Sequence, residues 1–357
     1  MKKSVLALAV LGSFAGVAAA QGSVTLFGVV DLNVRMVDNN ERSYSLSQDG
    51  MASSRLGFRG VEDLGGGLKA SFWLEGALGP DTGTGTSSYG NGDRANGAYV
   101  FQRRSTVSLS NRWGELRLGR DYTPQFWSWT VFDPFGTNGV GSALNLAVLA
   151  NAVQGSGGAY GTLVRANNMV QYILPNGVFG PGLYGQLSVA AGEGAVANKM
   201  FGGRIGYAAG PFNVAAAYSD TDVSIDGNVT ASNWNVAGSW DFKFLKLSAF
   251  YSQIEVDGFV GGTAGQDNWY VGLSAPLGQA NLKASWGQVD GTGQSSSYGA
   301  KQWAVGADYN LSKRTAMYVT LSSINNNSAS NFRIAAQGAL SAGQSSTGGE
   351  VGVRHSF

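Results

Sequence analysis

Hydrophobic and polar residues alternate along most of this chain, over stretches of about ten residues that are separated by turns. In the stretch VTLFGVVDLNVRM, every second residue from Val24 is apolar or glycine, and Asp31, Asn33 and Arg35 occupy positions between them. The stretches NWNVAGSWD, NWYVGLSAPL, ANLKASWGQ and KQWAVGADY follow the same scheme, with tryptophan on the apolar face. This alternation predicts β-strands whose two faces meet different surroundings.

We expect about sixteen such strands, an even number, as closed bacterial outer-membrane barrels require. The connections alternate between short turns, such as DLGGG and PLGQ, and long loops, such as VDNNERSYSLSQDG. This asymmetry is typical of an all-β, antiparallel transmembrane barrel. A soluble β-sandwich is the alternative, but the polar face is too rich in Asn, Ser, Gly and charge to form a dry core. The predicted strands begin near residues 23, 53, 68, 99, 115, 165, 182, 200, 211, 230, 244, 267, 280, 300, 314 and 347.

The chain ends in a strand pattern, GEVGVRHSF, in which Val351, Val353 and Phe357 share one face. An exposed strand edge with an apolar face would invite unwanted pairing in a soluble protein. In a membrane every backbone polar group must be paired, so a spanning sheet has to close on itself. We therefore expect the last strand to pair with the first, residues 24–36, and Phe357 to lie in an interfacial aromatic girdle.

The N-terminus has the pattern of a secretory signal peptide. Lys2 and Lys3 precede an apolar stretch, and the small residues up to Ala20 form a cleavage site, so the mature chain is expected to begin at Gln21. A membrane anchor is the alternative, but the apolar run is short for one. Residues 1–20 are assigned to the signal peptide and residues 21–357 to the barrel.

Composition narrows the classes of partner. Charged residues make up 13% of the chain, against the ~25% usual for soluble domains. Loss of Lys2 and Lys3 with the signal peptide changes the formal net charge from +1 to −1. A nucleic-acid-binding protein would carry a clustered basic excess, so no nucleic-acid partner is expected. The absence of cysteine excludes disulfides and thiolate metal sites.

The sequence contains few of the motifs that catalysis or metal binding would require. His355 is the only histidine, so the residues commonly used for a hydrolase triad or a multi-histidine metal site are missing. The GPGLYG segment has dinucleotide-fingerprint spacing but leads into a strand pattern, so it is expected to be a turn. DVSIDGN (Asp222–Asn228) resembles the start of a calcium loop whose closing position is Asn233 instead of an acid. We predict no catalysis, no cofactor and no metal, with structural calcium there as an alternative.

The longest connection, residues 123–164, shows no strand alternation. Its aromatic residues, including Trp129 and Phe135, make it too apolar for a disordered tail. Such a loop needs walls to pack on, and the barrel interior offers them, so we expect a constriction loop with a short helix at Asn145–Val153. Asp133 is its only acidic residue. The alternative is an external loop that helps subunits associate.

Several arginines face the lumen by strand parity: Arg35, Arg55, Arg59, Arg104, Arg117 and Arg165. A narrow passage lined by one sign of charge concentrates counter-ions even when the total charge is near zero. Each arginine alone is explained equally well as a strut or a solvated wall residue. Because the set has no evident facing acidic cluster, we predict a preference for anions.

Five segments resemble general diffusion porins of the Gram-negative outer membrane, especially their anion-selective branch: QGSVTLFGVVDLNV, SSRLGFRGVEDLGGGLKASFWLE, RRSTVSLSNRWGELRLGRD, RANNMVQY and GVRHSF. They occur in the family's order and spacing, and the resemblance covers the whole mature chain. It implies a sixteen-stranded homotrimer in outer-membrane lipid and lipopolysaccharide, with an inward-folded third long loop. It also implies that Phe357 is part of the signal read by the barrel-assembly machinery.

The family places a basic cluster on the second and fourth strands and just after the loop. This resemblance assigns the cluster to Arg55, to Arg103 and Arg104, and to Arg165. Alternation favours Arg104 over Arg103, but a bulge would reverse this, so both are kept. Gln102 stands where the anion-selective branch can carry a further basic residue, and this departure weakens the expected selectivity. The predicted function is passive diffusion of small anions and hydrophilic solutes; a solute-specific channel and a structural or adhesive barrel are the alternatives.

Overall fold

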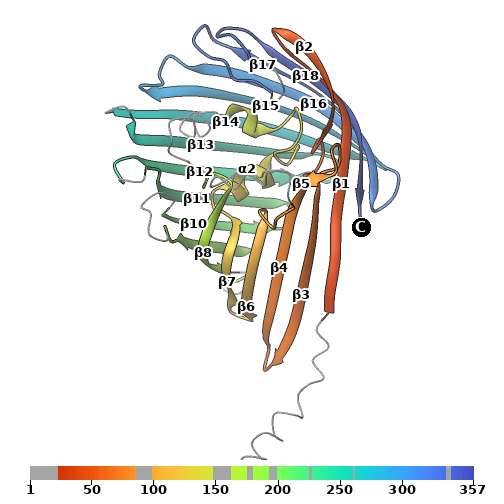
Figure 1. The fold of residues 1–357 in the computed structure, drawn as a ribbon, viewed down its shortest axis with the longest axis vertical. Coiled ribbons are helices and arrows are strands. Elements are labelled where there is room, and N and C mark those ends of the chain that lie inside the picture. The colour runs from red at the N-terminus through yellow and green to blue at the C-terminus, as the bar shows by residue number, and fades with distance from the viewer. Residues whose placement is uncertain are drawn as a thin grey trace, which may run out of the picture.

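The first and last strands pair with each other and close a barrel (Figure 1). β1 (Ser23–Asn39) runs antiparallel to β18 (Ser346–Ser356), with Val29 opposite Ser356. Phe357 extends the pairing, because its backbone exchanges hydrogen bonds of 3.0 and 3.1 Å with the backbone of Gly28. The closure predicted from the unpaired terminal strand is confirmed.

The computed structural model describes residues 23–85, 99–147, 162–174, 180–192, 199–224, 227–259, 262–334 and 339–357. The predicted signal peptide, residues 1–20, lies outside them. Within the described ranges, no helix is long and apolar enough to cross a membrane.

Sixteen antiparallel strands form the closed barrel. β2 (Glu41–Gln48) and β5 (Thr84–Gly85) are additional short strands, and β1 pairs with β2 near its end and with β3 near its start. The other strands are β3 (Arg55–Gly65), β4 (Leu68–Gly79), β6 (Arg104–Asn111), β7 (Gly114–Tyr122), β8 (Arg165–Leu174), β9 (Leu183–Ala190), β10 (Met200–Ala209), β11 (Phe212–Asp222), β12 (Thr230–Asp241), β13 (Lys246–Phe259), β14 (Gly262–Leu277), β15 (Ala280–Gly293), β16 (Gly299–Asn310) and β17 (Thr315–Asn326).

Two strands begin elsewhere than the alternation predicts. β6 begins at Arg104 instead of near residue 99, because Tyr99 and Phe101 leave the ladder. The Tyr99 hydroxyl donates to the backbone carbonyl of Leu56, and the Phe101 ring meets the Phe58 ring edge-on. β14 begins at Gly262 instead of near residue 267, because its Gly-rich start shows no alternation and yet pairs with β13.

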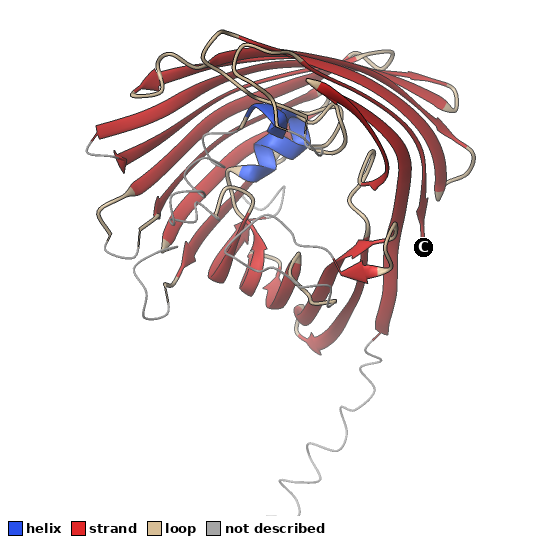
Figure 2. Cartoon of the chain, turned by 45° about the horizontal axis from the view of Figure 1, so that its top comes forward, coloured by secondary structure: helices blue, strands red, loops and turns tan. Residues whose placement is uncertain are grey.

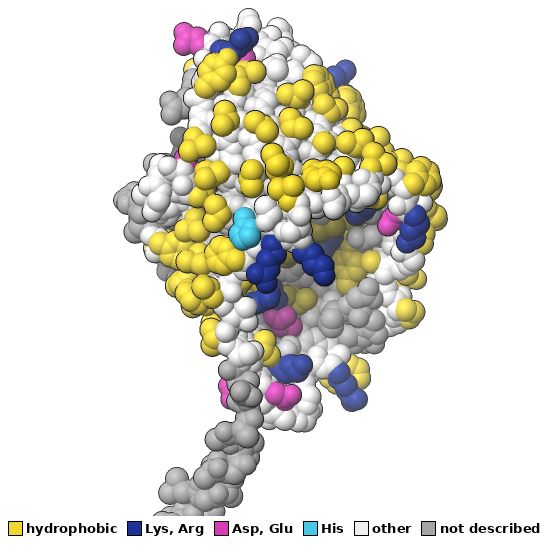
Figure 3. Space-filling model, turned by 90° about the vertical axis from the view of Figure 1, so that its right-hand side faces the viewer, with side chains coloured by type: hydrophobic (Ala, Val, Ile, Leu, Met, Phe, Trp, Pro, Cys, Tyr) yellow, Lys and Arg dark blue, Asp and Glu magenta, His cyan; other side chains and the backbone are white. Residues whose placement is uncertain are grey.

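The two faces of the wall differ as the alternation predicts. The outward side chains are mainly apolar and exposed, and hydrophobic side chains spread widely over the outer surface (Figure 3). Tryptophans 234, 269, 286 and 303 all belong to this exposed set. Inward positions are mainly Asn, Gln, Ser, Thr and charged residues. An apolar outer face suits lipid, and a polar inner face suits water.

The long connection after β7 packs on the inner wall. It contains α2 (Phe126–Phe132) and the 3₁₀ turn η1 (Ala143–Leu146), and α2 lies within the ring of strands (Figure 2). Trp129 is buried against Phe250, with ring centroids 4.9 Å apart, and Phe250 stacks on Tyr270. The described part of the loop is therefore not external.

Polar side chains of the inner wall also hold this loop. Its irregular backbone leaves carbonyl groups unpaired, and buried carbonyls need partners. Asn235 Nδ2 donates to Gln125 O at 3.1 Å, and Ser248 Oγ donates to Phe132 O at 2.7 Å. Gln266 and Gln302 donate in the same way to carbonyls near η1. The helix predicted at Asn145–Val153 lies mostly outside the described residues, and the helix at α2 was missed.

Candidate functional site

A cavity of about 530 Å³ lies between the loop and one side of the wall. Asp49 and Tyr122 belong to its lining. Four arginines face the cavity from the wall side: Arg35, Arg55, Arg103 and Arg165. The loop side contributes Phe126, Trp127, Thr130, Asn138 and Asn145. The site thus combines a cationic wall with an aromatic and amide-bearing loop.

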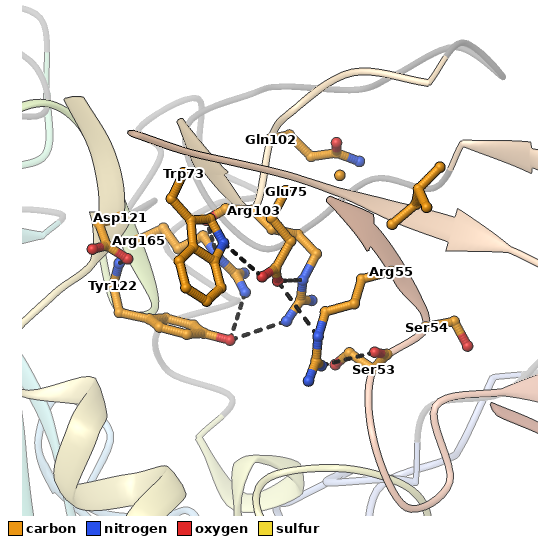
Figure 4. Close-up of polar contacts among 12 residues, drawn as sticks. Ser53, Ser54, Arg55, Trp73, Glu75, Gln102, Arg103, Asp121, Tyr122 and Arg165 are labelled. Atoms are coloured by element: carbon orange, nitrogen blue, oxygen red, sulfur yellow. Dashed lines mark hydrogen bonds and ion pairs between the residues drawn. The ribbon is translucent and has the colours of Figure 1, made fainter. Parts of the chain in front are cut away.

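Arg103 and Arg165 are joined through Tyr122 (Figure 4). The Tyr122 phenolic oxygen accepts an N–H from Arg103 at 3.1 Å and another from Arg165 at 2.8 Å. Arg165 Nε donates to the Arg103 carbonyl at 2.9 Å, and its guanidinium lies 4.3 Å from the Tyr122 ring centroid. This network immobilises both guanidinium groups at the cavity.

Acidic residues on the same wall pair with the arginines. Arg103 Nε donates to Glu75 Oε1 at 2.7 Å, and Arg55 Nε lies 3.8 Å from the same oxygen. Glu350 pairs with Arg35 at 2.8 Å and also accepts the backbone N–H of Val140 in the loop. The expectation of arginines without facing acids was therefore wrong. Parity puts Glu75 and Glu350 on the inner face, but it did not indicate how close they come to the arginines.

The choice between Arg103 and Arg104 is settled by where β6 starts. Arg103 precedes the strand, so alternation does not constrain it, and it lines the cavity. Arg104 points inward elsewhere, where it lies 3.5 Å from Asp121 and 4.5 Å from the Trp73 ring centroid. Arg59 stacks on the same Trp73 ring at 5.2 Å. Neither Arg59 nor Arg104 lines the cavity.

The connection between β2 and β3 carries Asp49 into the site. The Asp31 carboxylate holds this connection by accepting backbone N–H groups of Met51 at 2.9 Å and Ala52 at 2.8 Å, and it also accepts from the Tyr318 hydroxyl. Burial raises the pKa of Asp49 to about 6, although the N–H of Ser54 favours the charged form. Asp49 therefore titrates close to neutral pH.

The three loop residues singled out from the sequence serve to anchor the loop. Asp133 accepts backbone N–H groups of Phe135, Thr137 and Ala143 at 2.8, 3.0 and 3.0 Å, and it accepts the Tyr270 hydroxyl at 2.5 Å. Burial raises the pKa of the Asp133 carboxyl. Trp129 and Phe135 are buried as well. None of these three side chains lines the cavity.

No group of three or more His, Cys, Asp or Glu side chains in the described ranges could hold a metal ion. Residues 225 and 226 of the Asp222–Asn228 segment lie outside those ranges.

Comparison with known proteins agrees with this architecture. The sequence profile of the Gram-negative porin family matches residues 7–329. Outer membrane porin protein 32 of Delftia acidovorans is 38% identical over 370 aligned residues that cover all of both chains. An outer membrane porin protein of Bordetella pertussis is 31% identical, again over the full length of both chains.

Solved structures show the same fold. An anion-selective porin from Comamonas acidovorans matches with a TM-score of 0.82 at 34% identity, over 94% of this chain and 100% of that one. The trimer form of OmpT from Vibrio cholerae has a TM-score of 0.68 at 13% identity, over 94% and 99% of the two chains, a likeness of fold alone. The relatives are porins, which are channels and not enzymes. This chain belongs to the Gram-negative porin family and is an outer-membrane porin.

Proposed function

We propose that this porin lets small hydrophilic solutes diffuse passively through a water-filled channel that prefers anions to cations. The observation that carries the preference is the cavity lining, where four arginines accompany a single acidic residue, Asp49. Glu75 and Glu350 offset part of this charge from beside the arginines. The 34% identity to an anion-selective porin supports the same preference.

The preference for anions depends on the short distance between a passing ion and the arginines. An ion in the cavity lies within a Debye length of the guanidinium groups, about 8–10 Å at physiological salt, so screening is incomplete. A passage lined mainly by one sign of charge raises the local concentration of counter-ions. Charged residues outside the cavity and its wall are more distant and are screened by salt.

A potassium chloride gradient across a planar bilayer tests the preference. The reversal potential of the wild type should indicate chloride preference at low salt. Arg55→Glu should shift it toward potassium, and the shift should fade at high salt because screening increases. Arg42→Glu is the matched control, since Arg42 is exposed and pairs with Asp38 away from the cavity. A wild-type reversal potential on the potassium side would refute the charge assignment.

We further propose that residues 123–164 form the constriction loop and that the chain acts as a homotrimer without enzymatic activity. The position of residues 123–147 inside the barrel supports the first point. Trimer formation in a porin of the same fold supports the second. Sedimentation of the detergent-solubilised protein would test it, and a monomer would contradict it.

A further inference from the structure

We propose that the cavity binds carboxylates that carry a flat apolar ring, so that aromatic monocarboxylates are preferred solutes of this porin. The inference builds on the anion preference proposed above and specifies which anions the cavity retains. It depends on one arrangement: hydrogen-bond donors on the wall face an accessible tryptophan on the loop.

The wall offers donors of the kind that carboxylates bind. Among the four cavity arginines, Arg55 is the most accessible, with its side chain 29% exposed against 12% for Arg35 and 7% for Arg103. Arg165 is buried. The closest carboxylate contact of Arg55 is the long one to Glu75, at 3.8 Å. The Tyr122 oxygen already accepts two N–H groups from arginines, which cannot accept in return, so its own hydrogen is free to donate. Charge-assisted bonds from such donors to a carboxylate are strong.

The loop offers a flat ring beside these donors. Two tryptophans lie on α2, and residues two apart on a helix point about 200° apart. Trp129 is only 1% exposed and holds α2 on the wall through Phe250. Trp127 instead lines the cavity, and its ring meets the Tyr122 ring edge-on at 5.3 Å. Its indole N–H has no hydrogen-bond partner among the described residues.

The arrangement separates solutes by shape as well as charge. Chloride or acetate can use only the donors, whereas an aromatic carboxylate can also stack on Trp127. The cavity volume of about 530 Å³ falls within the roughly 300–1,000 Å³ typical of small-molecule sites. A few exposed contacts give binding that is weak enough for release, as conduction requires.

Inhibition of the chloride current through single channels tests this inference. Benzoate, cyclohexanecarboxylate and acetate carry the same charge but differ in their apolar part. We expect benzoate to halve the current at about one-tenth of the acetate concentration, given the usual strength of ring stacking. Cyclohexanecarboxylate should fall between them. In Trp127→Ala the benzoate-to-acetate ratio should shrink to about twofold or less, whereas Trp127→Phe, which keeps a flat ring, should retain most of it.

The ratio compares two solutes in the same channel, so a general change in channel width largely cancels. Trp113→Ala is the matched control, because Trp113 is exposed in the turn between β6 and β7, and it should keep the wild-type ratio. Equal potency of benzoate and acetate in a channel that still prefers chloride to potassium would overturn this inference and leave the anion preference standing. An unchanged ratio in Trp127→Ala would also overturn it. A wild type without chloride preference would overturn the proposed function itself.

Discussion

Arg103 Nε donates to Glu75 Oε1 at 2.7 Å, so an acidic partner of the basic wall lies directly beside the cavity. The same oxygen lies 3.8 Å from Arg55, and Trp73 Nε1 donates to the other oxygen at 3.1 Å. Guanidinium groups this close repel one another, and a shared carboxylate offsets that repulsion. Glu75 therefore assembles the arginines and at the same time lowers their net charge.

Glu75→Gln should strengthen the preference for anions. Glutamine keeps a carbonyl acceptor for Arg103 but removes the negative charge. A unit charge about 4 Å away is worth about 1 kcal/mol in water, so the chloride-to-potassium permeability ratio should rise up to about fivefold at low salt. Reversal potentials measure this ratio. Glu62→Gln, at an exposed position of β3, is the control and should leave it unchanged. A lower ratio in Glu75→Gln would contradict the charge-offset role.

The preference for anions should increase as the pH falls from about 7.5 to 5. Because the pKa of Asp49 is about 6, its carboxyl is charged above that pH and neutral below it. Protonation removes the negative charge that lines the cavity and leaves the four arginines. Reversal potentials recorded across this range should follow one titration, and Asp49→Asn should abolish it. Asp63→Asn, at an exposed position near the end of β3, should retain the titration. Persistence of the titration in Asp49→Asn would assign it to another group.

Asp133→Asn should loosen the docked loop. The amide has one acceptor oxygen in place of two, so some of the three backbone N–H groups lose their partner. Each buried group left unpaired costs about 1–3 kcal/mol. We expect greater noise in the open-channel current, which reports motion of the loop. Tyr270→Phe removes one hydrogen bond and should have a smaller effect. Equal noise in wild type and Asp133→Asn would mean that the loop is held by its aromatic packing.

Phe357→Ala should lower the yield of folded barrel in the outer membrane. The substitution keeps both backbone hydrogen bonds to Gly28 and removes only the ring, which lies where a Gly28 side chain would be. Deleting Phe357 removes the ring and the hydrogen bonds together. The heat-modifiable fraction on gels measures folding for both variants. Phe244→Ala, at an exposed position between β12 and β13, is the control. A normal yield for Phe357→Ala and a low one for the deletion would assign the effect to strand closure and not to a signal.

The strand alternation alone was enough to predict the fold. The stretches alternate with a period of two, their number is even, and the last strand has no partner next to it in the sequence. A closed membrane barrel is the fold that pairs every backbone group of such strands. Most strand starts could be predicted this way because each strand needs only its local pattern. β6 and β14 start elsewhere than predicted. β6 starts later because Tyr99 leaves the ladder, and β14 starts earlier at Gly262, which has no side chain to show the alternation.

The make-up of the site required the three-dimensional structure. Parity places Arg55, Arg104 and Arg165 inside the barrel, but it gives neither their height along the wall nor their neighbours. The height and the neighbours of each arginine follow from the pairing registers of the strands. The register of β4 with β6 places Glu75 opposite Arg104 and close to Arg103. Arg103 itself lies before β6, where alternation no longer applies. Trp127 faces the cavity because Trp129, on the other side of α2, packs against Phe250 of the wall. Packing between residues so far apart in the sequence produces no periodic pattern that could predict it.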